Sequence, residues 1–234
     1  MPGTWRTCSL RHVDPAQLAL LYPTLYHMAE DGTWPSIHQN GLLSTQAIVD
    51  LYQPDGEVRE QILSTVRRDK ITLTSSELGE MSIRDQRPAK FLKECMNDGV
   101  SPQDYLDALN GRVFFWLRQS RLTRLLNARL YRRSRHTVLH VDTASLVDAY
   151  AGGVQLAPYN TGSMHVPNAP KRGPDVFTDI ADYPYERWRA KRGSSGDPVV
   201  ELTIRYAVPD ILRFVTRVET WEGGGPIAAL YTNN

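Results

Sequence analysis

The chain has 234 residues, of which 41% are hydrophobic and 23% are charged, and its formal net charge is +1. This composition is typical of a globular protein and excludes collagen-like, coiled-coil and disordered chains. No stretch approaches the roughly 18 apolar residues that a membrane span requires, and the first residues contain no apolar signal-peptide segment. Cys8 and Cys95 form neither a disulfide framework nor a zinc motif. We therefore expect a cytoplasmic protein with one domain, residues 1–234, without a membrane partner or a bound metal.

Capping residues and apolar periodicity divide the first half of the chain into helices and short strands. Asp14 and Pro15 are typical of a helix start, and Gly41 and Gly111 are typical of residues that follow a helix. Helical segments are predicted from 15 towards 23, within 34–43, and over 45–52, 57–68 and 102–110. Strands are predicted over 25–29, 71–75 and 112–117.

The second half combines an arginine-rich segment, strands and one long irregular segment. Residues 118–136 carry seven arginines and no acidic residue, with leucines at helical spacing on the opposite side. Residues 152–196 are rich in Gly, Pro and Asn and show little periodicity, which is typical of binding loops. Strands are predicted over 137–141, 199–206 and 211–221. This order predicts an α+β domain around a mixed sheet.

The candidate functional residues are polar side chains within or beside apolar strands, because the common phosphate-loop, dinucleotide, zinc-protease and nucleophile motifs do not occur. His27 either completes the core through a backbone hydrogen bond or fixes a ligand. Glu201 either faces solvent or is presented to a cleft, where partial burial would raise its pKa and suit it to general-base work. Arg84 and Arg87 are either solvated or bind a phosphate.

Four segments that are weak signals one by one form a specific combination. Residues 26–44 contain Tyr-His-Met-Ala, Trp-Pro-Ser-Ile and Gly-Leu-Leu-Ser, residues 82–87 contain an isoleucine and two arginines, and residues 112–116 form an aromatic strand. In residues 200–211 a glutamate is followed by Val-Pro. This combination resembles the DarT-like (DNA-targeting) ADP-ribosyltransferases, and most closely a related bacterial group. The resemblance implies an ADP-ribosyltransferase-like core of two small packed sheets with peripheral helices.

The resemblance also implies NAD as the substrate, no metal, and a role for each matched residue. Glu201 and Arg87 would be catalytic. The residues expected to bind NAD are His27, Met28, Gly41, Ser44, Arg84, Phe114 and Phe115, and core filling is the alternative for the two phenylalanines. Within the long segment 152–196 and the arginine-rich segment, the residues expected to bind the acceptor are Tyr159, Asn160, His165, Lys171, Arg172, Arg118 and Arg121.

The activity expected from this resemblance is mono-ADP-ribosylation of a nucleic-acid base in a toxin or phage-defence setting. Single-stranded DNA is favoured over RNA as the acceptor, and the acceptor segment mixes aromatic and cationic side chains as single-strand-binding surfaces do. An antitoxin or an ADP-ribosyl hydrolase is the implied protein partner. Two kinds of alternative stay open: an NAD glycohydrolase or RNA 2′-phosphotransferase on the same fold, and an inactive module that binds nucleic acid through its arginines. Those arginines could equally form a solvated face.

Overall fold

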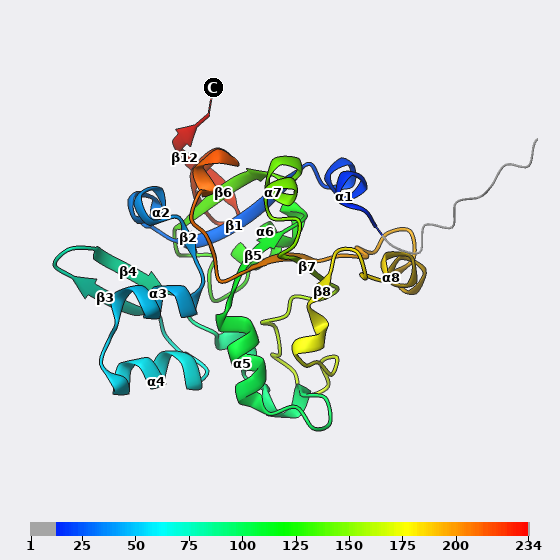
Figure 1. Cartoon of the computed structure of the whole chain (residues 1–234), viewed down its shortest axis with the longest axis horizontal. Helices are drawn as coiled ribbons and strands as arrows, with labels where there is room; N and C mark the ends of the chain where they lie inside the picture. Colours follow the sequence, from blue (N-terminus) through cyan, green and yellow to red (C-terminus); the bar gives the residue numbers. More distant parts are fainter. Residues whose placement is uncertain (1–12, 234) are drawn as a thin grey trace, which may run out of the picture.

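A computed structural model describes residues 13–233 (Figure 1), so Cys8 lies outside the described part. The α-helices are α1 Pro15–Leu21, α2 Trp34–Asn40, α3 Thr45–Tyr52, α4 Gly56–Ser64, α5 Pro102–Asn110, α6 Gln119–Leu126, α7 Thr143–Ala149 and α8 Tyr185–Arg192. The strands are β1 Thr24–Glu30, β2 Leu42–Leu43, β3 Ile71–Ser75, β4 Gly79–Ile83, β5 Arg112–Trp116, β6 His136–Asp142, β7 Val154–Ala157, β8 Thr178–Asp179, β9 Glu201–Arg205, β10 Ala207–Val208, β11 Val215–Glu222 and β12 Gly225–Thr232. Within this part, no helix has the length and apolar character to cross a membrane.

The capping residues read from the sequence define several helix ends. The Asp14 carboxylate accepts a hydrogen bond from the backbone N–H of Gln17 at the start of α1. Ser101 and Asp104 form a reciprocal capping box at the start of α5. These contacts satisfy backbone N–H groups that a helix start otherwise leaves without partners, so the helix starts predicted there are confirmed.

Eight of these strands form one sheet in the order β12-β11-β6-β1-β5-β9-β7-β8, while β2 pairs with β10 and β3 pairs with β4 in two small separate sheets. The predicted α+β class is confirmed, but the expected core of two small packed sheets is wrong. The expected mixed sheet is also wrong, because every strand pairing in this sheet is antiparallel. Alternation along a strand shows which residues share a face, but it does not show which strands become neighbours or in which direction they run.

The two central strands of the sheet are joined much more weakly than their neighbours. β1 pairs with β6 along its whole length, and β5 pairs with β9 along its whole length. Between β1 and β5, however, the register contains the single pair Tyr26 and Trp116. The sheet therefore consists of two four-stranded halves that meet at one point, and the backbones beside that point are free to separate.

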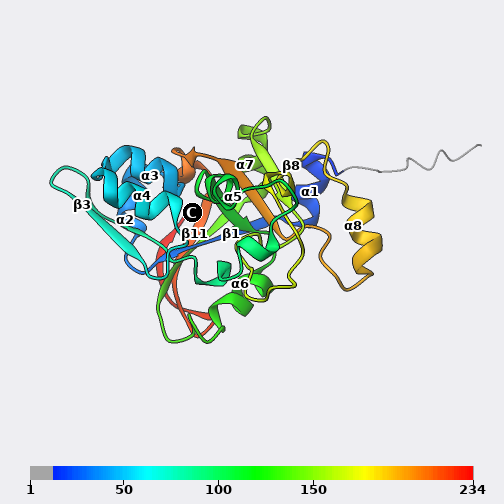
Figure 2. The ribbon, with the colours of Figure 1, turned by 90° about the horizontal axis from the view of Figure 1, so that it is seen from below.

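Helices cover both faces of the sheet (Figure 2). Leu18 of α1 and Leu146 of α7 pack into the main core with residues of the inner strands. On the opposite face, Leu122 and Leu126 of α6 pack against Met28 and neighbouring side chains. A separate small core joins α3, α4 and the β3–β4 hairpin, which extend from one side of the sheet in Figure 1.

Two long segments differ from their sequence predictions. The arginine-rich helix ends at Leu126, and residues 127–134 form turns, since a continuous helix would crowd like charges without acidic partners. The segment 152–196 contains β7 inside the main sheet and also α8. β7 has only four residues, which is too few for an alternating pattern of apolar and polar residues to be recognised in the sequence.

Candidate active site

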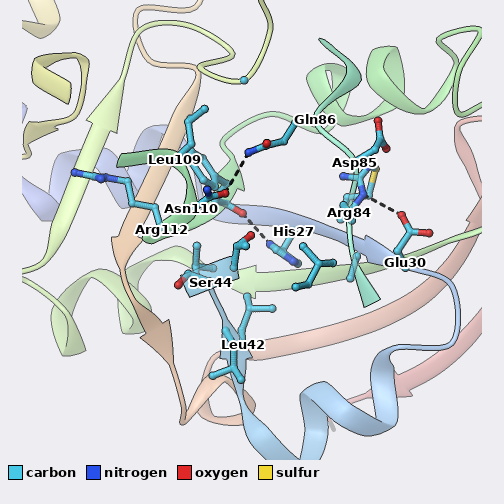
Figure 3. Close-up of a pocket in the computed structure, with 18 of the residues that line it drawn as sticks. His27, Glu30, Leu42, Ser44, Arg84, Asp85, Gln86, Leu109, Asn110 and Arg112 are labelled. Carbon is cyan, nitrogen blue, oxygen red and sulfur yellow. Dashed lines mark hydrogen bonds and ion pairs between the residues drawn. The ribbon is translucent and has the colours of Figure 1, made fainter. Parts of the chain in front are cut away.

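A cavity of about 290 Å³ lies where the two halves of the sheet separate (Figure 3). β1 and β5 contribute its floor, the start of α3 and the end of β4 form its sides, and the turn 160–162 closes it beside β9. His27 and Glu201 both line this cavity, although 174 positions separate them in the chain. The predicted residues Met28, Gly41, Ser44, Arg84, Phe114, Phe115 and Asn160 line it as well.

His27 extends from β1 across the gap towards β5 (Figure 3). Its Nδ1 lies 2.8 Å from the carbonyl oxygen of Phe114, which can only accept, so Nδ1 carries the proton. Burial lowers the pKa of His27 to about 4, against the opposing effect of that hydrogen bond. The ring is therefore neutral at pH 7. Nε2 has no hydrogen-bond partner within residues 13–233 and can accept a hydrogen bond from a ligand hydroxyl.

Glu201 begins β9 and is 4% exposed. Its Oε2 accepts hydrogen bonds from the side-chain hydroxyl of Thr161 at 2.7 Å and from the backbone N–H of Thr161 at 3.1 Å. Burial raises the pKa of Glu201 to about 7, although the two hydrogen bonds and the charges of Arg172 and Arg121 favour the carboxylate. Oε1 has no protein partner in the described part of the chain. A carboxyl group that ionises near neutral pH is suited to accept a proton.

Three arginines line the cavity, although the guanidinium of Arg112 is directed away from it, over the ring of Phe177 and towards Gln155. Arg84 forms an ion pair with Glu30 at 3.1 Å (Figure 3), and its guanidinium lies over the ring of Tyr131. Arg67 is 6% exposed and has no carboxylate partner among the described residues. Arg112 likewise has no carboxylate partner there, and its Nε is buried without a hydrogen bond. Burial lowers the pKa of both Arg67 and Arg112 to about 10, so both remain charged at neutral pH.

The guanidinium of Arg67 is held by neutral groups. It donates hydrogen bonds to the carbonyl oxygens of Ile62 and Arg84 and to the side-chain oxygen of Asn110. Its remaining nitrogen points to the hydroxyl of Thr45, the first residue of α3, at 3.5 Å. The charge of Asp85, which also lines the cavity, favours the charged form of Arg67, but no carboxylate of the described chain forms an ion pair with it. A buried cation without a direct ion-pair partner, beside a helix N-terminus, favours an anionic ligand.

Contacts within the protein explain in part why a glycine stands at position 41 and a serine at position 44. Gly41 has φ +77, and a Cβ there would lie 2.4 Å from Cα of Pro209, so only glycine fits this close approach. The Ser44 hydroxyl accepts a hydrogen bond from the backbone N–H of Ala47 and caps α3. Both residues therefore shape the cavity wall through the turn and the helix start that they stabilise.

The two phenylalanines of β5 have different surroundings. Phe115 is fully buried in the main core, and its ring contacts the edge of the His27 ring at a centroid distance of 5.8 Å. Phe114 is partly buried and packs against Phe177. Core packing thus accounts for Phe115, whereas Phe114 retains an open side at the cavity.

Arg87 lies outside the group of residues that line the cavity. Its guanidinium pairs with Asp69 at 2.6 Å and also donates to the carbonyl oxygen of Arg68. Arg84, three positions earlier, occupies the cavity wall instead. Within residues 13–233, no group of three or more His, Cys, Asp or Glu side chains is arranged to hold a metal ion.

Many of the residues predicted to bind the acceptor surround a second cavity of about 350 Å³. It is lined by Tyr159, Asn160, His165, Arg172 and Arg121, together with Arg192 and small or apolar neighbours. Asn160 lines both cavities, so the turn 160–162 separates them. Two of the predicted residues do not line the second cavity: Lys171 is exposed, and Arg118 forms an ion pair with Asp197 at 2.6 Å.

Several cavity residues had no signal in the sequence. Arg67 was part of a predicted amphipathic segment, but α4 ends at Ser64, and the turn that follows inserts Arg67 beneath the cavity. Thr161 lies in the irregular segment, where nothing marks it as a partner of Glu201. Arg112 was predicted only as the first residue of a strand. Burial of a cation in a loop depends on long-range packing, which periodicity does not report.

Comparisons with known proteins identify a family and one similar structure. A family model with the description family of unknown function (DUF7002) matches residues 23–215, a range that includes every residue lining the first cavity. No curated protein matches the chain. Among solved structures, the chain is similar to Thermosipho africanus DarTG in complex with ADP-ribose, with 12% identity and a TM-score of 0.39. That alignment covers 85% of this chain and 44% of the other, so this chain spans less than half of that protein's length.

Proposed function

We propose that this chain, which belongs to the DUF7002 family, is a mono-ADP-ribosyltransferase that transfers ADP-ribose from NAD to a base of single-stranded DNA. We further propose that it acts as a toxin or in phage defence, with an antitoxin or an ADP-ribosyl hydrolase as its partner. The activity and the acceptor follow the sequence resemblance to DarT-like transferases.

The observation that carries the proposed activity is the shared cavity of His27 and Glu201. Had these side chains lain on walls of separate cavities, no dinucleotide could contact both. Instead, both line the opening between β1 and β5, and each presents one atom without a protein partner in the described chain. The pair supplies a neutral acceptor for a ribose hydroxyl and a carboxylate for charge stabilisation.

In the proposed reaction, the bond between the nicotinamide nitrogen and C1′ of the ribose breaks. Nicotinamide leaves with the bonding electron pair as a neutral molecule, so no strong general acid is needed. The carboxylate of Glu201 stabilises the positive charge that develops on the ribose. A nitrogen or oxygen of the acceptor then bonds to C1′, and its proton passes to Glu201, which ionises near neutral pH.

The charge around the cavity supports a ligand that carries phosphates. Arg67 and Arg112 have no carboxylate partners within residues 13–233, and Arg84 shares its charge with Glu30. A diphosphate would neutralise Arg67, which otherwise stays buried at a cost in free energy, and would give Arg84 a second anionic partner. In this proposal Arg84 and Arg67 bind the diphosphate, and Arg87 acts only through the loop that it stabilises.

The acceptor would enter from the second cavity, across the turn 160–162 from Glu201. Tyr159 contributes an aromatic ring with the guanidinium of Arg192 over it, and Arg121, which forms an ion pair with Asp197 at 2.7 Å, lines the same cavity. Stacking on aromatic rings together with contacts to phosphates is how proteins hold single-stranded nucleic acid. The rest of the segment 152–196, to which Tyr159 and Arg192 belong, would provide the remaining acceptor contacts.

The direct test incubates the purified chain with NAD labelled in its adenosine moiety and with single-stranded DNA, RNA or protein. We expect label on the DNA, and none with Glu201→Gln. Label on protein or RNA alone would reject the proposed acceptor. Loss of NAD without any labelled product would identify a glycohydrolase, and absence of both NAD loss and NAD binding would reject the enzyme and leave the nucleic-acid-binding module.

A further inference from the structure

Thr161 is the residue that holds Glu201 in place. It is fully buried, and both its hydroxyl and its backbone N–H donate to the same carboxylate oxygen, Oε2, at 2.7 Å and 3.1 Å. Two donors from one residue fix the plane of the carboxylate as well as its position, because rotation about the last side-chain bond would break both hydrogen bonds. The other oxygen, Oε1, is left without a protein partner in the described part of the chain.

The turn that carries Thr161 is itself held by a buried cation. Arg172 is 3% exposed, and one of its terminal nitrogens donates to the carbonyl oxygens of Asn160 and Thr161, at 3.1 Å and 3.2 Å. Its Nε donates to the carbonyl oxygen of Pro170 at 2.9 Å. These bonds to backbone carbonyls fix the turn between the two cavities, and the charge of Arg172, like that of Arg121, also favours the carboxylate form of Glu201.

We propose that Thr161 is a positioning residue for the reaction of Glu201: it immobilises Oε2 and leaves Oε1 as the single oxygen that contacts the ribose and receives the acceptor's proton. Arg172 acts one step further away, by fixing the turn that carries Thr161. This inference rests on the proposed function for its catalytic meaning. The hydrogen-bonding arrangement that it describes can be tested without any activity.

The arrangement has a measurable consequence for proton binding. Hydrogen bonds to a carboxylate favour its charged form, and burial opposes that form. The two bonds from Thr161 therefore keep the pKa of Glu201 near neutral in a site that would otherwise raise it further. Loss of the hydroxyl leaves burial less opposed, so a smaller fraction of the enzyme would hold an ionised base at pH 7.

The test is a ¹³C NMR titration of the Glu201 carboxyl group without NAD, in the wild type, Thr161→Val and Thr161→Ser. The Glu201 signal is assigned by its absence in Glu201→Gln. We expect Thr161→Val to move the titration midpoint upward by about one to two pH units, because a hydrogen bond to a charged group is lost. Thr161→Ser retains the hydroxyl and should titrate like the wild type. Thr161→Ala provides the same comparison if valine disturbs the fold.

The outcomes separate the two proposals. An unchanged midpoint in a folded Thr161→Val, or equal shifts in the valine and serine variants, would overturn the positioning role whatever the activity. A shift restored by serine supports it, and the acidic limb of the transfer rate should then move by the same amount. If the NMR shift occurs but the wild type transfers no ADP-ribose, the proposed function fails while the hydrogen-bonding role of Thr161 stands.

Discussion

The sheet carries two histidine–glutamate sets whose side chains are arranged in opposite ways. On β6 and β11, His140 and Glu219 contact each other directly, with Nε2 and Oε2 2.9 Å apart. On β1 and β9, His27 and Glu201 both line the cavity, and each has one side-chain atom, Nε2 or Oε1, without a hydrogen-bond partner among residues 13–233. The same two residue types therefore produce a closed pair at one site and an open pair at the other.

In the closed pair, Glu219 accepts hydrogen bonds from further neighbours besides His140. Glu219 also accepts hydrogen bonds from the indole N–H of Trp221 at 2.9 Å and from Arg217 at 3.1 Å. Burial opposes ionisation of Glu219, but these donors and His140 outweigh it and hold the pKa of Glu219 below its usual range. At Glu201 the balance is reversed, because Thr161 is its one hydrogen-bonding residue within the described chain, and burial raises the pKa to about 7.

The difference shows how a structural carboxylate can be distinguished from a reactive one. A carboxylate whose two oxygens both have protein partners is stabilised as an anion and has little acceptor capacity left for a substrate. A carboxylate with one bonded and one open oxygen, beside a cavity, retains both a position and a free acceptor. Because few hydrogen bonds offset the effect of burial, the pKa of such a carboxylate also lies near neutral pH.

The largest expected effect is on transfer. Glu201→Gln has nearly the same shape and can still accept the hydrogen bonds from Thr161, but it cannot take a proton or stabilise positive charge. We expect the rate of label transfer from NAD to fall by about 10² to 10⁴-fold, with NAD binding largely retained. Glu219→Gln is the matched control. A loss of transfer per folded molecule as large in the control would contradict the distinction between the two carboxylates.

The next prediction concerns stability and has opposite signs at the two sites. Glu219→Gln removes the charge that the hydrogen bonds from Trp221 and His140 stabilise in the interior, and it should lower the free energy of unfolding by about 1–3 kcal/mol. For Glu201, the folded-state pKa lies above the ordinary value of 4.5, so the native state loses stability as pH rises from about 4.5 through about 7. Glu201→Gln should therefore stabilise the protein by about 1–3 kcal/mol at pH 8 and change little at pH 4.

Urea unfolding of both variants at the two pH values measures this prediction. The wild type must unfold reversibly at each pH so that the free energies can be compared. Equal stability of Glu201→Gln and wild type at pH 8 would show that burial of the Glu201 charge costs little, and it would remove the physical basis for a base that ionises near neutrality.

A smaller effect is expected from the buried cation. Arg67→Met removes the charge at the start of α3, and we expect the affinity for ADP to fall by about 10 to 100-fold while adenosine, which lacks phosphates, binds equally to both proteins. Calorimetry with the two ligands measures this difference. Arg67→Lys keeps the charge and checks for a folding defect, and Arg59→Met removes an exposed arginine paired with Asp50 outside the cavity. Equal losses for ADP and adenosine would contradict a phosphate-binding role.

The sequence predicted the local part of this structure well. The helix caps at Asp14, Ser44 and Ser101, the closing Gly41, and the strands that carry His27 and Glu201 all follow from interactions within a few residues. Such interactions are encoded by neighbouring positions, so one sequence is sufficient to read them. The rise in pKa expected for a buried Glu201 is also found, while its role as a general base stays a prediction.

The parts that the sequence did not predict depend on contacts between distant segments. The single eight-stranded sheet arises from the pair Tyr26 and Trp116, which no periodic pattern specifies. Arg67 becomes a cavity residue only because α4 ends early and the chain turns back beneath α3. The sequence resemblance favoured Arg87 over Arg84, but the position of Arg87 outside the cavity depends on its pairing with Asp69, a contact between segments that the local pattern does not report.

The smallest effect should come from His27, and its pH dependence distinguishes the open pair from the closed one. Because burial lowers the pKa of His27 to about 4, Nε2 is an unprotonated acceptor throughout the range from pH 5.5 to 8.5. His27→Phe removes one hydrogen bond to the ligand and should weaken NAD binding by about tenfold, whereas His140→Phe should leave it unchanged.

Calorimetry in a Glu201→Gln background prevents turnover and removes the titration of Glu201. In that background, the loss caused by His27→Phe should be constant across the range. If the loss of affinity appeared only above a midpoint near pH 6.5, His27 would titrate like a histidine in water. That outcome would contradict a neutral ring whose Nδ1–H is fixed by the carbonyl of Phe114 and whose Nε2 accepts from the ligand.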